Sequence, residues 1–211
     1  MVRLLEGTLI SAGNDEYARS NGSYGLTTLR NKHVRVRGEK VEFTFNGKSG
    51  KRHEIEVCDA KLAKTVRHCR DLPGHELFQF TDEDGKIHDV TSQDVNDYLR
   101  EIAGEEFTAK DFRTWAGTVL AVQSLRKLGD AESKTAAKRQ LVQAIDSVAE
   151  QLGNTRAVCR SSYIHPAVVD DYLDQTLLRS CTNRGCRKAR GGLSADEQSV
   201  LRWLERRKRG G

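Results

Sequence analysis

The sequence predicts an α+β, mainly helical fold in which a small lobe with an antiparallel β-meander, residues 1–90, precedes a helical lobe, residues 91–211. Three short runs in the first lobe alternate apolar and polar residues, which is the period of a half-buried strand. From residue 91 onward, apolar residues recur every three or four positions, which is the period of an amphipathic helix. At 211 residues, we expect both lobes to belong to one domain.

The first lobe is predicted to begin with two short helices. Glycine-containing breaks at Gly13–Asp15 and Gly22–Gly25 delimit these helices within the first 30 residues. Turn residues then separate the three alternating runs, so we expect consecutive strands to pair antiparallel and to share one apolar face. The runs are His33–Arg37, Val41–Phe45 and His53–Val57.

A second hairpin and several helices are predicted after the meander. Leu77–Phe80 and Ile87–Val90 flank a turn rich in Asp and Gly. Thr91 is placed to cap a helix that Gly104 stops, and Thr108 to cap the next one. The remaining predicted elements are a long helix ending at Gly153, a helix over Val168–Leu177, a loop at Asn183–Gly192 and a last short helix holding Leu201, Trp203 and Leu204.

Hydropathy excludes a helical membrane protein. No apolar run approaches the roughly 18–20 residues that a membrane helix needs. The N-terminus also lacks an apolar stretch followed by a small-residue cleavage site, which a secretory signal would show. We therefore expect no membrane partner and no secretion.

The charge is distributed unevenly along the chain. Residues 1–52 hold 10 Lys and Arg against 5 Asp and Glu, residues 53–178 hold 15 against 22, and residues 179–211 hold 10 against 3. Two basic ends that flank an acidic middle indicate a surface for a polyanion, because Lys and Arg clusters release counterions when they neutralise phosphates. For the run Arg206–Arg209 alone, a solvated tail is an equally good interpretation.

The cysteines predict free thiols. Their number is odd and no pair has CxxC spacing, which is typical of a protein kept in a reducing compartment, so we expect a cytoplasmic location. A zinc site that uses Cys58, His68 and Cys69 is the alternative, but no paired ligand set supports it, and we predict no metal. The five are Cys58, Cys69, Cys159, Cys181 and Cys186.

Two cationic side chains stand where they could meet a phosphate. Lys48 lies in a glycine-flanked turn, Gly47–Lys51, that lacks the spacing of a Walker A loop. Arg113 lies on the predicted polar side of a helix whose Phe112 and Trp115 fill the core. The alternatives are a solvated turn lysine and an arginine paired with a surface carboxylate.

Tyr163 lies in a segment of a different kind. Residues 152–166 are crowded with hydrogen-bonding side chains and end at Pro166, which disfavours helix at His165. Tyr163 therefore lies beside a helix boundary. A half-buried core tyrosine with a solvated hydroxyl is the alternative.

Four motifs resemble one family. The first, Gly13–Arg19 followed by Asn21–Arg30, resembles the start of the catalytic domain of type IB DNA topoisomerases of the bacterial and poxvirus-like kind. Phe43–Gly50, Lys110–Gly117 and Leu152–Pro166 resemble later parts of that domain, in the same order and at compatible spacing. The resemblance covers nearly the whole chain apart from the last ~30 residues. It implies the fold of DNA breaking-rejoining enzymes, duplex DNA as partner, a bacterial nucleoid-associated protein, and ATP-independent relaxation of supercoils without a cofactor.

The resemblance also implies roles for four residues. Tyr163 would attack a backbone phosphate and form a 3′-phosphotyrosyl link, and Lys48 would protonate the leaving 5′-oxygen. Arg113 would contact phosphate oxygens as the second catalytic arginine. Asn154 stands where many relatives carry histidine, and its amide would donate one neutral hydrogen bond to a phosphate oxygen.

Ser11 departs from the family pattern. It occupies the position of the first catalytic arginine, so one of two guanidinium groups around the phosphate is absent. Losing a single preorganised donor typically costs about 10²–10³ in rate. We therefore expect a chain that folds and binds DNA but cleaves it slowly, or not at all unless another cation fills the gap.

Four further residues are candidate DNA contacts. Tyr24, Arg30 and Lys32 flank the motif that follows the second predicted helix, and Lys110 precedes Arg113 by one helical turn. For each, a solvated surface residue is the alternative.

The length of the chain leads to a second expectation. Family members usually carry an N-terminal domain that closes the other side of a clamp around DNA, and Met1 lies at the expected start of the catalytic domain. We expect a catalytic fragment or a truncated homologue, acting as a monomer and binding DNA with a reduced salt slope.

Two other functions compete with relaxation. A tyrosine recombinase uses the same chemistry, but its second motif usually reads HxxR followed by histidine, whereas Lys110 and Thr114 stand at those places here. A non-catalytic or weakly catalytic DNA-binding homologue is favoured by Ser11 and by the expected missing clamp half. The joint presence of Tyr163, Arg113 and Lys48 disfavours it.

Overall fold

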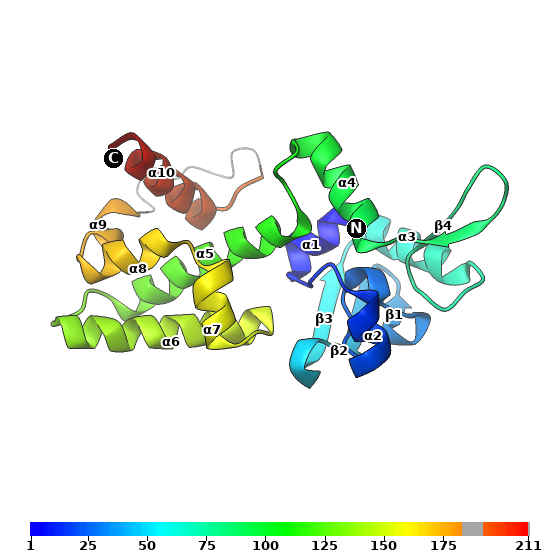
Figure 1. The fold of residues 1–211 in the computed structure, drawn as a ribbon, viewed down its shortest axis with the longest axis horizontal. Coiled ribbons are helices and arrows are strands. Elements are labelled where there is room, and N and C mark those ends of the chain that lie inside the picture. Colours follow the sequence, from blue (N-terminus) through cyan, green and yellow to red (C-terminus); the bar gives the residue numbers. More distant parts are fainter. Residues whose placement is uncertain (183–191, 211) are drawn as a thin grey trace. The chain divides into compact units, whose positions relative to one another are not determined.

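The computed structural model describes residues 1–182 and 192–210 (Figure 1). The chain divides into two compact units, Met1–Arg113 and Thr114–Gly211. Residues 183–191 of the predicted loop Asn183–Gly192 lie outside the described residues. The first unit contains α1 (Val2–Thr8), α2 (Asp15–Asn21), β1 (Val34–Arg37), β2 (Lys40–Asn46), β3 (Arg52–Cys58), α3 (Ala60–Asp71), β4 (Gln79–Thr81), β5 (Ile87–Asp89), α4 (Ser92–Ala103) and the start of α5 (Ala109–Leu128).

The second unit holds the rest of α5 and is helical throughout its described residues. Its long helix α6 buries a stripe of small and aliphatic side chains on one face, as its apolar spacing predicts. Its other elements are α6 (Lys134–Leu152), α7 (Arg156–Val158), a π-helical turn (Cys159–Tyr163), α8 (Pro166–Leu173), α9 (Leu177–Ser180) and α10 (Ala195–Gly210).

The predicted meander is confirmed. β1, β2 and β3 pair antiparallel in that order, with Val34 opposite Phe43 and Phe43 opposite Ile55. Val41, Phe43 and Phe45 are buried, so one face of the sheet is apolar, as period-2 alternation requires. The second predicted hairpin forms between β4 and β5.

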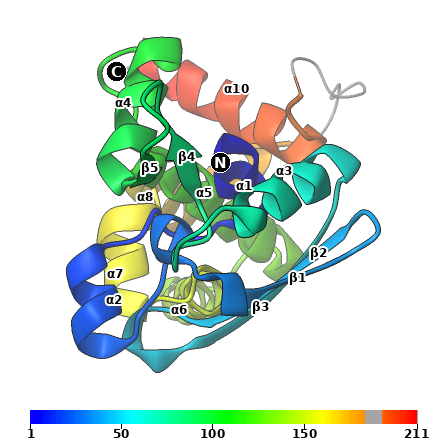
Figure 2. The same cartoon turned by 90° about the vertical axis from the view of Figure 1, so that its right-hand side faces the viewer.

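One helix, α3, was not predicted from the sequence. α3 follows the meander directly and packs against β1 and β2 (Figure 2). Its buried residues, Ala63 and Val66, are small and stand among charged neighbours, so the run holds few of the large apolar residues that mark a core-facing helix. Asp59 caps the helix by accepting a hydrogen bond from the backbone N–H of Leu62.

The two compact units divide after Arg113, whereas we predicted a lobe boundary after residue 90. α4 and the first turn of α5 belong with the sheet because Val95, Leu99 and Ala109 join its hydrophobic core. The boundary between the units therefore follows which residues share a hydrophobic core, and not the point where strands give way to helices.

Caps and turns end the helices largely where the sequence predicts. The Thr91 hydroxyl accepts from the N–H of Asp94, whose carboxylate accepts from the N–H of Thr91, and Gly104 ends α4. Gly153 ends α6 in the left-handed conformation. The helix predicted over Val168–Leu177 is instead two helices, because Gln175 has φ 57°, which breaks the helical path. None of the helices in the described residues combines the length and apolar character needed to cross a bilayer.

His33 is a buried polar residue of the first unit, at 8% exposure. Its Nδ1 accepts the backbone N–H of Arg30 at 3.0 Å, and its ring contacts that of Tyr24 with centroids 4.3 Å apart. Burial lowers the pKa of His33 to about 4, and the cationic Lys32 and Arg30 act in the same direction. His33 is therefore neutral in the folded protein at pH 7.

We predict that His33 makes the first unit acid-sensitive. The unfolded chain takes up this proton near pH 6.5 and the folded chain only near pH 4. The free energy of unfolding should therefore fall by up to about 3 kcal/mol as pH drops from 6.5 to 4. Urea denaturation followed by circular dichroism across this range measures the loss. His33→Asn keeps an acceptor near the place of Nδ1 but does not titrate; an undiminished pH dependence in this variant would contradict the assignment.

Candidate active site

Ser11 lies in a loop whose backbone is tightly fixed. The carbonyl oxygens of Ser11 and Ala12 accept the N–H groups of Leu26 and Thr27 at 2.8 and 2.7 Å. This loop and the segment that begins at Gly25 pack backbone against backbone. A Cβ on Gly25 would lie 2.5 Å from the Cα of Gly13. The Ser11 side chain is exposed. Its position is thus set by the backbone, while the space beyond its side chain is open.

Arg113 is buried, which corrects the prediction of an arginine on the polar side of its helix. It is 5% exposed, and its Nη1 donates to the carbonyl oxygen of Leu9. Leu9 ends α1 in the left-handed conformation, with φ 57°, and stands two residues before Ser11. A buried guanidinium needs such acceptors because desolvating a charge is costly. Arg113 therefore joins α5 to the loop that carries Ser11. Lys110, one turn earlier, is exposed.

Lys48 lies at the tip of the β2–β3 hairpin, as predicted. It opens a short 3-10 turn, Lys48–Gly50, and its side chain is exposed. The N–H of Gly47 donates to the carbonyl oxygen of Lys51 at 2.7 Å, which closes the tip. An exposed lysine on a closed turn can reach a bound phosphate without first leaving a partner in the core.

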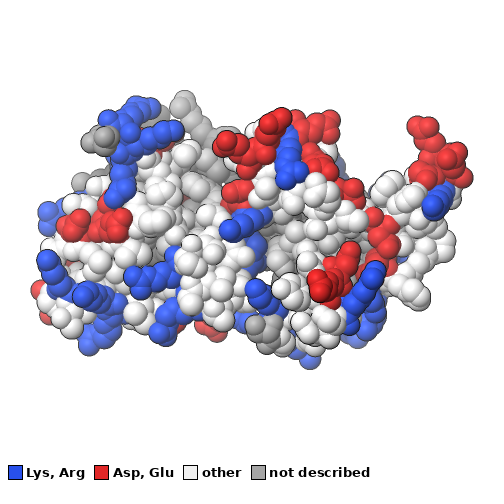
Figure 3. Space-filling view, viewed as in Figure 1, with Lys and Arg blue, Asp and Glu red and all other residues white. Residues whose placement is uncertain are grey.

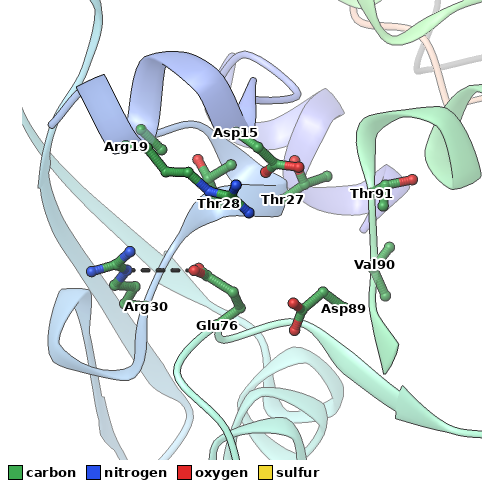
Figure 4. A pocket seen from close by; sticks show the side chains of 10 residues that line it. Asp15, Arg19, Thr27, Thr28, Arg30, Glu76, Asp89, Val90 and Thr91 are labelled. Atoms are coloured by element: carbon green, nitrogen blue, oxygen red, sulfur yellow. Dashed lines mark ion pairs between the residues drawn. The ribbon is translucent and has the colours of Figure 1, made fainter. Parts of the chain in front are cut away.

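Arg30 lines a small polar pocket in the first unit. Tyr24 is half-buried, and Lys32 is exposed. The Arg30 guanidinium carbon lies 5.6 Å from the centroid of the Tyr24 ring, and its Nε lies 3.4 Å from a carboxylate oxygen of Glu76. Figure 4 shows this ion pair at the edge of a cavity of about 60 Å³. Burial raises the pKa of Glu76, Arg30 opposes the rise, and Asp89 adds to it. Arg30 is therefore held by a carboxylate in the free protein.

Tyr163 ends the π-helical turn Cys159–Tyr163 in the second unit and is half-buried. One face of α5 holds the backbone on both sides of it. The Thr114 hydroxyl donates to the carbonyl oxygen of Ser162 at 3.3 Å, and the Thr118 hydroxyl accepts the N–H of His165 at 3.1 Å. Such single turns of π-helix are frequent at functional sites.

Gly117 allows α5 to approach Tyr163 closely. A Cβ on Gly117 would lie 2.5 Å from the carbonyl oxygen of Tyr163 and 3.2 Å from its Cβ. Gly117, Thr114 and Thr118 were not predicted from the sequence to position Tyr163. The one available signal was a glycine in a helix interior, where it costs about 1 kcal/mol relative to alanine unless packing requires it.

Asn154 directly follows the glycine that ends α6. Its backbone N–H donates to the carbonyl oxygen of Ala149 at 2.9 Å, and its side-chain Nδ2 donates to that of Leu152 at 3.1 Å. These bonds use helix-terminal carbonyl groups and orient the side chain. Asn154 and Tyr163 lie in the second unit, whereas Ser11, Lys48 and Arg113 lie in the first.

Acidic side chains gather over α4 and at the tip of the β4–β5 hairpin (Figure 3). In the basic run of α10, Arg206 donates to the carbonyl oxygen of Ser180 and Arg207 pairs with Asp171 at 3.0 Å, while Lys208 and Arg209 are exposed. Half of this run is thus engaged with neighbouring helices.

In residues 1–182 and 192–210, no three His, Cys, Asp or Glu side chains are grouped so as to hold a metal.

Comparison with known proteins decides the family. Residues 1–184 match the family model described as the catalytic core of eukaryotic DNA topoisomerase I. The chain belongs to the DNA topoisomerase I family. It is 37% identical over 172 residues to DNA topoisomerase 1B of Acanthamoeba polyphaga mimivirus, an alignment that covers 78% of this chain and 51% of the relative. It is 22% identical over 171 residues to DNA topoisomerase I of Monkeypox virus and to DNA topoisomerase 1B of Vaccinia virus (strain Copenhagen), covering 80% of this chain and 51% of each relative.

These topoisomerase relatives are viral, so they support the poxvirus-like part of the resemblance and leave the expected bacterial source unsupported. The chain spans about half the length of the curated relatives it matches. Helix α10 lies beyond the residues that match the family model.

We predict that Gly117→Ala destabilises the second unit although alanine is the better helix former. The added Cβ would collide with the Tyr163 carbonyl oxygen, so the free energy of unfolding should fall by about 1–3 kcal/mol. Gly7→Ala is the matched control, because Gly7 lies inside α1 and a Cβ there meets nothing within 4 Å. Urea denaturation followed by circular dichroism compares them; equal or higher stability of Gly117→Ala would show that Tyr163 is not held as described.

Proposed function

We propose that this chain is the catalytic part of a type IB DNA topoisomerase that relaxes supercoiled duplex DNA through a 3′-phosphotyrosyl intermediate, at a rate limited by Ser11. The observation that carries the proposal is the match of residues 1–184 to the family's catalytic core. Its support within the structure is a tyrosine whose backbone is held on both sides by α5.

The proposed reaction exchanges one phosphodiester for another. The Tyr163 hydroxyl oxygen attacks phosphorus, the bond from phosphorus to the 5′-oxygen breaks, and the phenol proton passes to water. Lys48 gives a proton to the departing 5′-oxygen. Because the phosphotyrosyl bond retains the energy of the broken bond, the 5′-hydroxyl can attack it after swivelling and restore the strand without ATP.

Charge stabilisation is where this chain departs from its family. In the proposal, Arg113 and Asn154 contact the non-bridging oxygens of the phosphate, which carry the charge that develops in the transition state. Ser11 supplies no cation there. Backbone hydrogen bonds to Leu26 and Thr27 fix the loop that carries Ser11, so in the proposal the missing element is the guanidinium.

The DNA partner is proposed to be held by more than this chain. We propose that a further domain, in the portion of the curated relatives that this chain does not span, closes a clamp on the opposite side of the duplex. By itself, a chain bound as a monomer through one side of the clamp neutralises fewer phosphates. Its affinity should therefore fall less steeply with salt.

We predict that the chain forms a covalent adduct with DNA through Tyr163. A duplex nicked so that the short 5′-hydroxyl strand diffuses away traps the adduct, which is read as a DNA-linked band on a denaturing gel. Tyr163→Phe should form none while retaining DNA affinity. The absence of an adduct from the unmodified chain after hours would favour the non-catalytic DNA-binding homologue, and a synaptic tetramer with cleaved paired sites would favour a recombinase.

We predict that Ser11→Arg raises the rate of plasmid relaxation by about 10²–10³, because it restores a preorganised cation to the phosphate site. Ser20→Arg is the control, since Ser20 is an exposed residue of α2 and the change adds the same charge elsewhere. Equal and fast relaxation by the unmodified chain and Ser11→Arg would show that another group already fills this role.

A further inference from the structure

His53 occupies an inward-facing position beside the tip that carries Lys48. It lies on β3 directly opposite Phe45 of β2. The two rings stack with centroids 5.1 Å apart and planes 14° from parallel. Because Phe45 is 4% exposed, the imidazole rests on the sheet core, and its plane is fixed by the ring beneath it.

The same imidazole supports the backbone of the tip. A Cβ on Gly47 would lie 2.5 Å from His53 Nε2 and 2.7 Å from its Cδ2. The Cα of Gly47 thus sits against the ring edge, closer than any residue with a side chain could. Gly47 immediately precedes Lys48 and forms the hydrogen bond to Lys51 that closes the turn. The position of the ring therefore sets the position of the turn from which Lys48 projects.

His53 also lies in the field of a second candidate catalytic cation. Burial lowers the pKa of His53, and the cations Lys51 of the tip and Arg113 of α5 lower it further. Phe45, the residue packed on its ring from β2, carries no charge. The imidazole is consequently neutral at pH 7, and a proton on it would add a third cation to Lys51 and Arg113.

We propose that His53 is the positioning residue of Lys48: its ring, clamped between Phe45 and Gly47, holds the hairpin tip where Lys48 can protonate the leaving 5′-oxygen. The proposal rests on the proposed function, because it needs Lys48 as the proton donor. It assigns to His53 no contact with DNA.

The chemistry of the leaving group allows a selective test. An alkoxide oxygen leaves poorly without a proton, whereas a sulfur in the same bridging place leaves as a thiolate, because thiols are much stronger acids than alcohols. A variant in which Lys48 is misplaced should therefore be slow with a 5′-oxygen and nearly normal with a 5′-sulfur. A variant with a damaged fold or weak DNA binding should be slow with both.

The experiment measures single-turnover adduct formation with the two nicked duplexes, one with a bridging 5′-oxygen and one with a bridging 5′-sulfur. His53→Ala should slow cleavage of the oxygen substrate by about 10–10², the cost of an ångström-scale misplacement, and of the sulfur substrate by less than about threefold. Lys48→Ala is the reference for a lost proton donor. Val57→Ala is the matched control, because Val57 is also half-buried on β3 but lies away from the tip; its oxygen-to-sulfur rate ratio should equal that of the unmodified chain.

A double-mutant cycle tests the contact itself. Gly47→Ala pushes the ring away and should reproduce the selective loss with the oxygen substrate. In the His53→Ala background there is no ring to displace, so adding Gly47→Ala should change the rate by less than about twofold. Additive losses would show that Gly47 and His53 act independently and would overturn the proposal.

The failure of the proposed function is separately visible. If Lys48→Ala is equally slow with both substrates, the assignment of Lys48 fails; if His53→Ala alone is equally slow with both, the positioning role of His53 fails. If the unmodified chain forms no adduct, the proposal is decided by amide relaxation of residues 47–51 in solution. His53→Ala should increase motion at the tip and Val57→Ala should not, and an unchanged tip would overturn it.

Discussion

Among the glycines whose added Cβ would come within 3 Å of another part of the chain, three stand next to a candidate catalytic position. Gly25 crosses the backbone that leads to Ser11, Gly47 meets the ring beneath the Lys48 turn, and Gly117 meets the carbonyl group of Tyr163. Such a close approach fixes the position of one segment relative to the other, because tightly packed atoms leave no room for movement. The candidate site is thus positioned by contacts that only the residue without a side chain permits.

Arg113 shows how burial changes the role of a charged side chain. A solvated arginine would move freely and contribute little beyond its charge. Here the guanidinium is buried and donates to the carbonyl oxygen of Leu9, so it also attaches the loop that carries Ser11 to α5. The same group lies close enough to affect His53. One buried cation therefore joins the helix to the loop and also lowers the pKa of a histidine on the hairpin.

Local sequence patterns predicted most helices and strands, whereas contacts between residues distant in sequence position the candidate site residues. The meander and the capped helices follow from alternation at Val41–Phe45 and from Thr91 and Gly104, all of which act within a few residues. α3 was missed because Ala63 and Val66 give little apolar signal among charges. The site residues came from family motifs. Their supports could not be predicted, because the contact of Gly117 with Tyr163 spans 46 positions of sequence and leaves no periodic trace.

The two tryptophans give the second unit a built-in optical probe. The indole N–H of Trp115 donates to Glu197 at 3.0 Å, and that of Trp203 donates to Asp171 at 2.9 Å. Each of these bonds joins α10 to another helix, and the sequence contains no further tryptophan. Intrinsic tryptophan fluorescence therefore reports, without any label, whether α10 is docked on the second unit. It does not report on the Lys48 hairpin or the Ser11 loop, because both lie in the first unit.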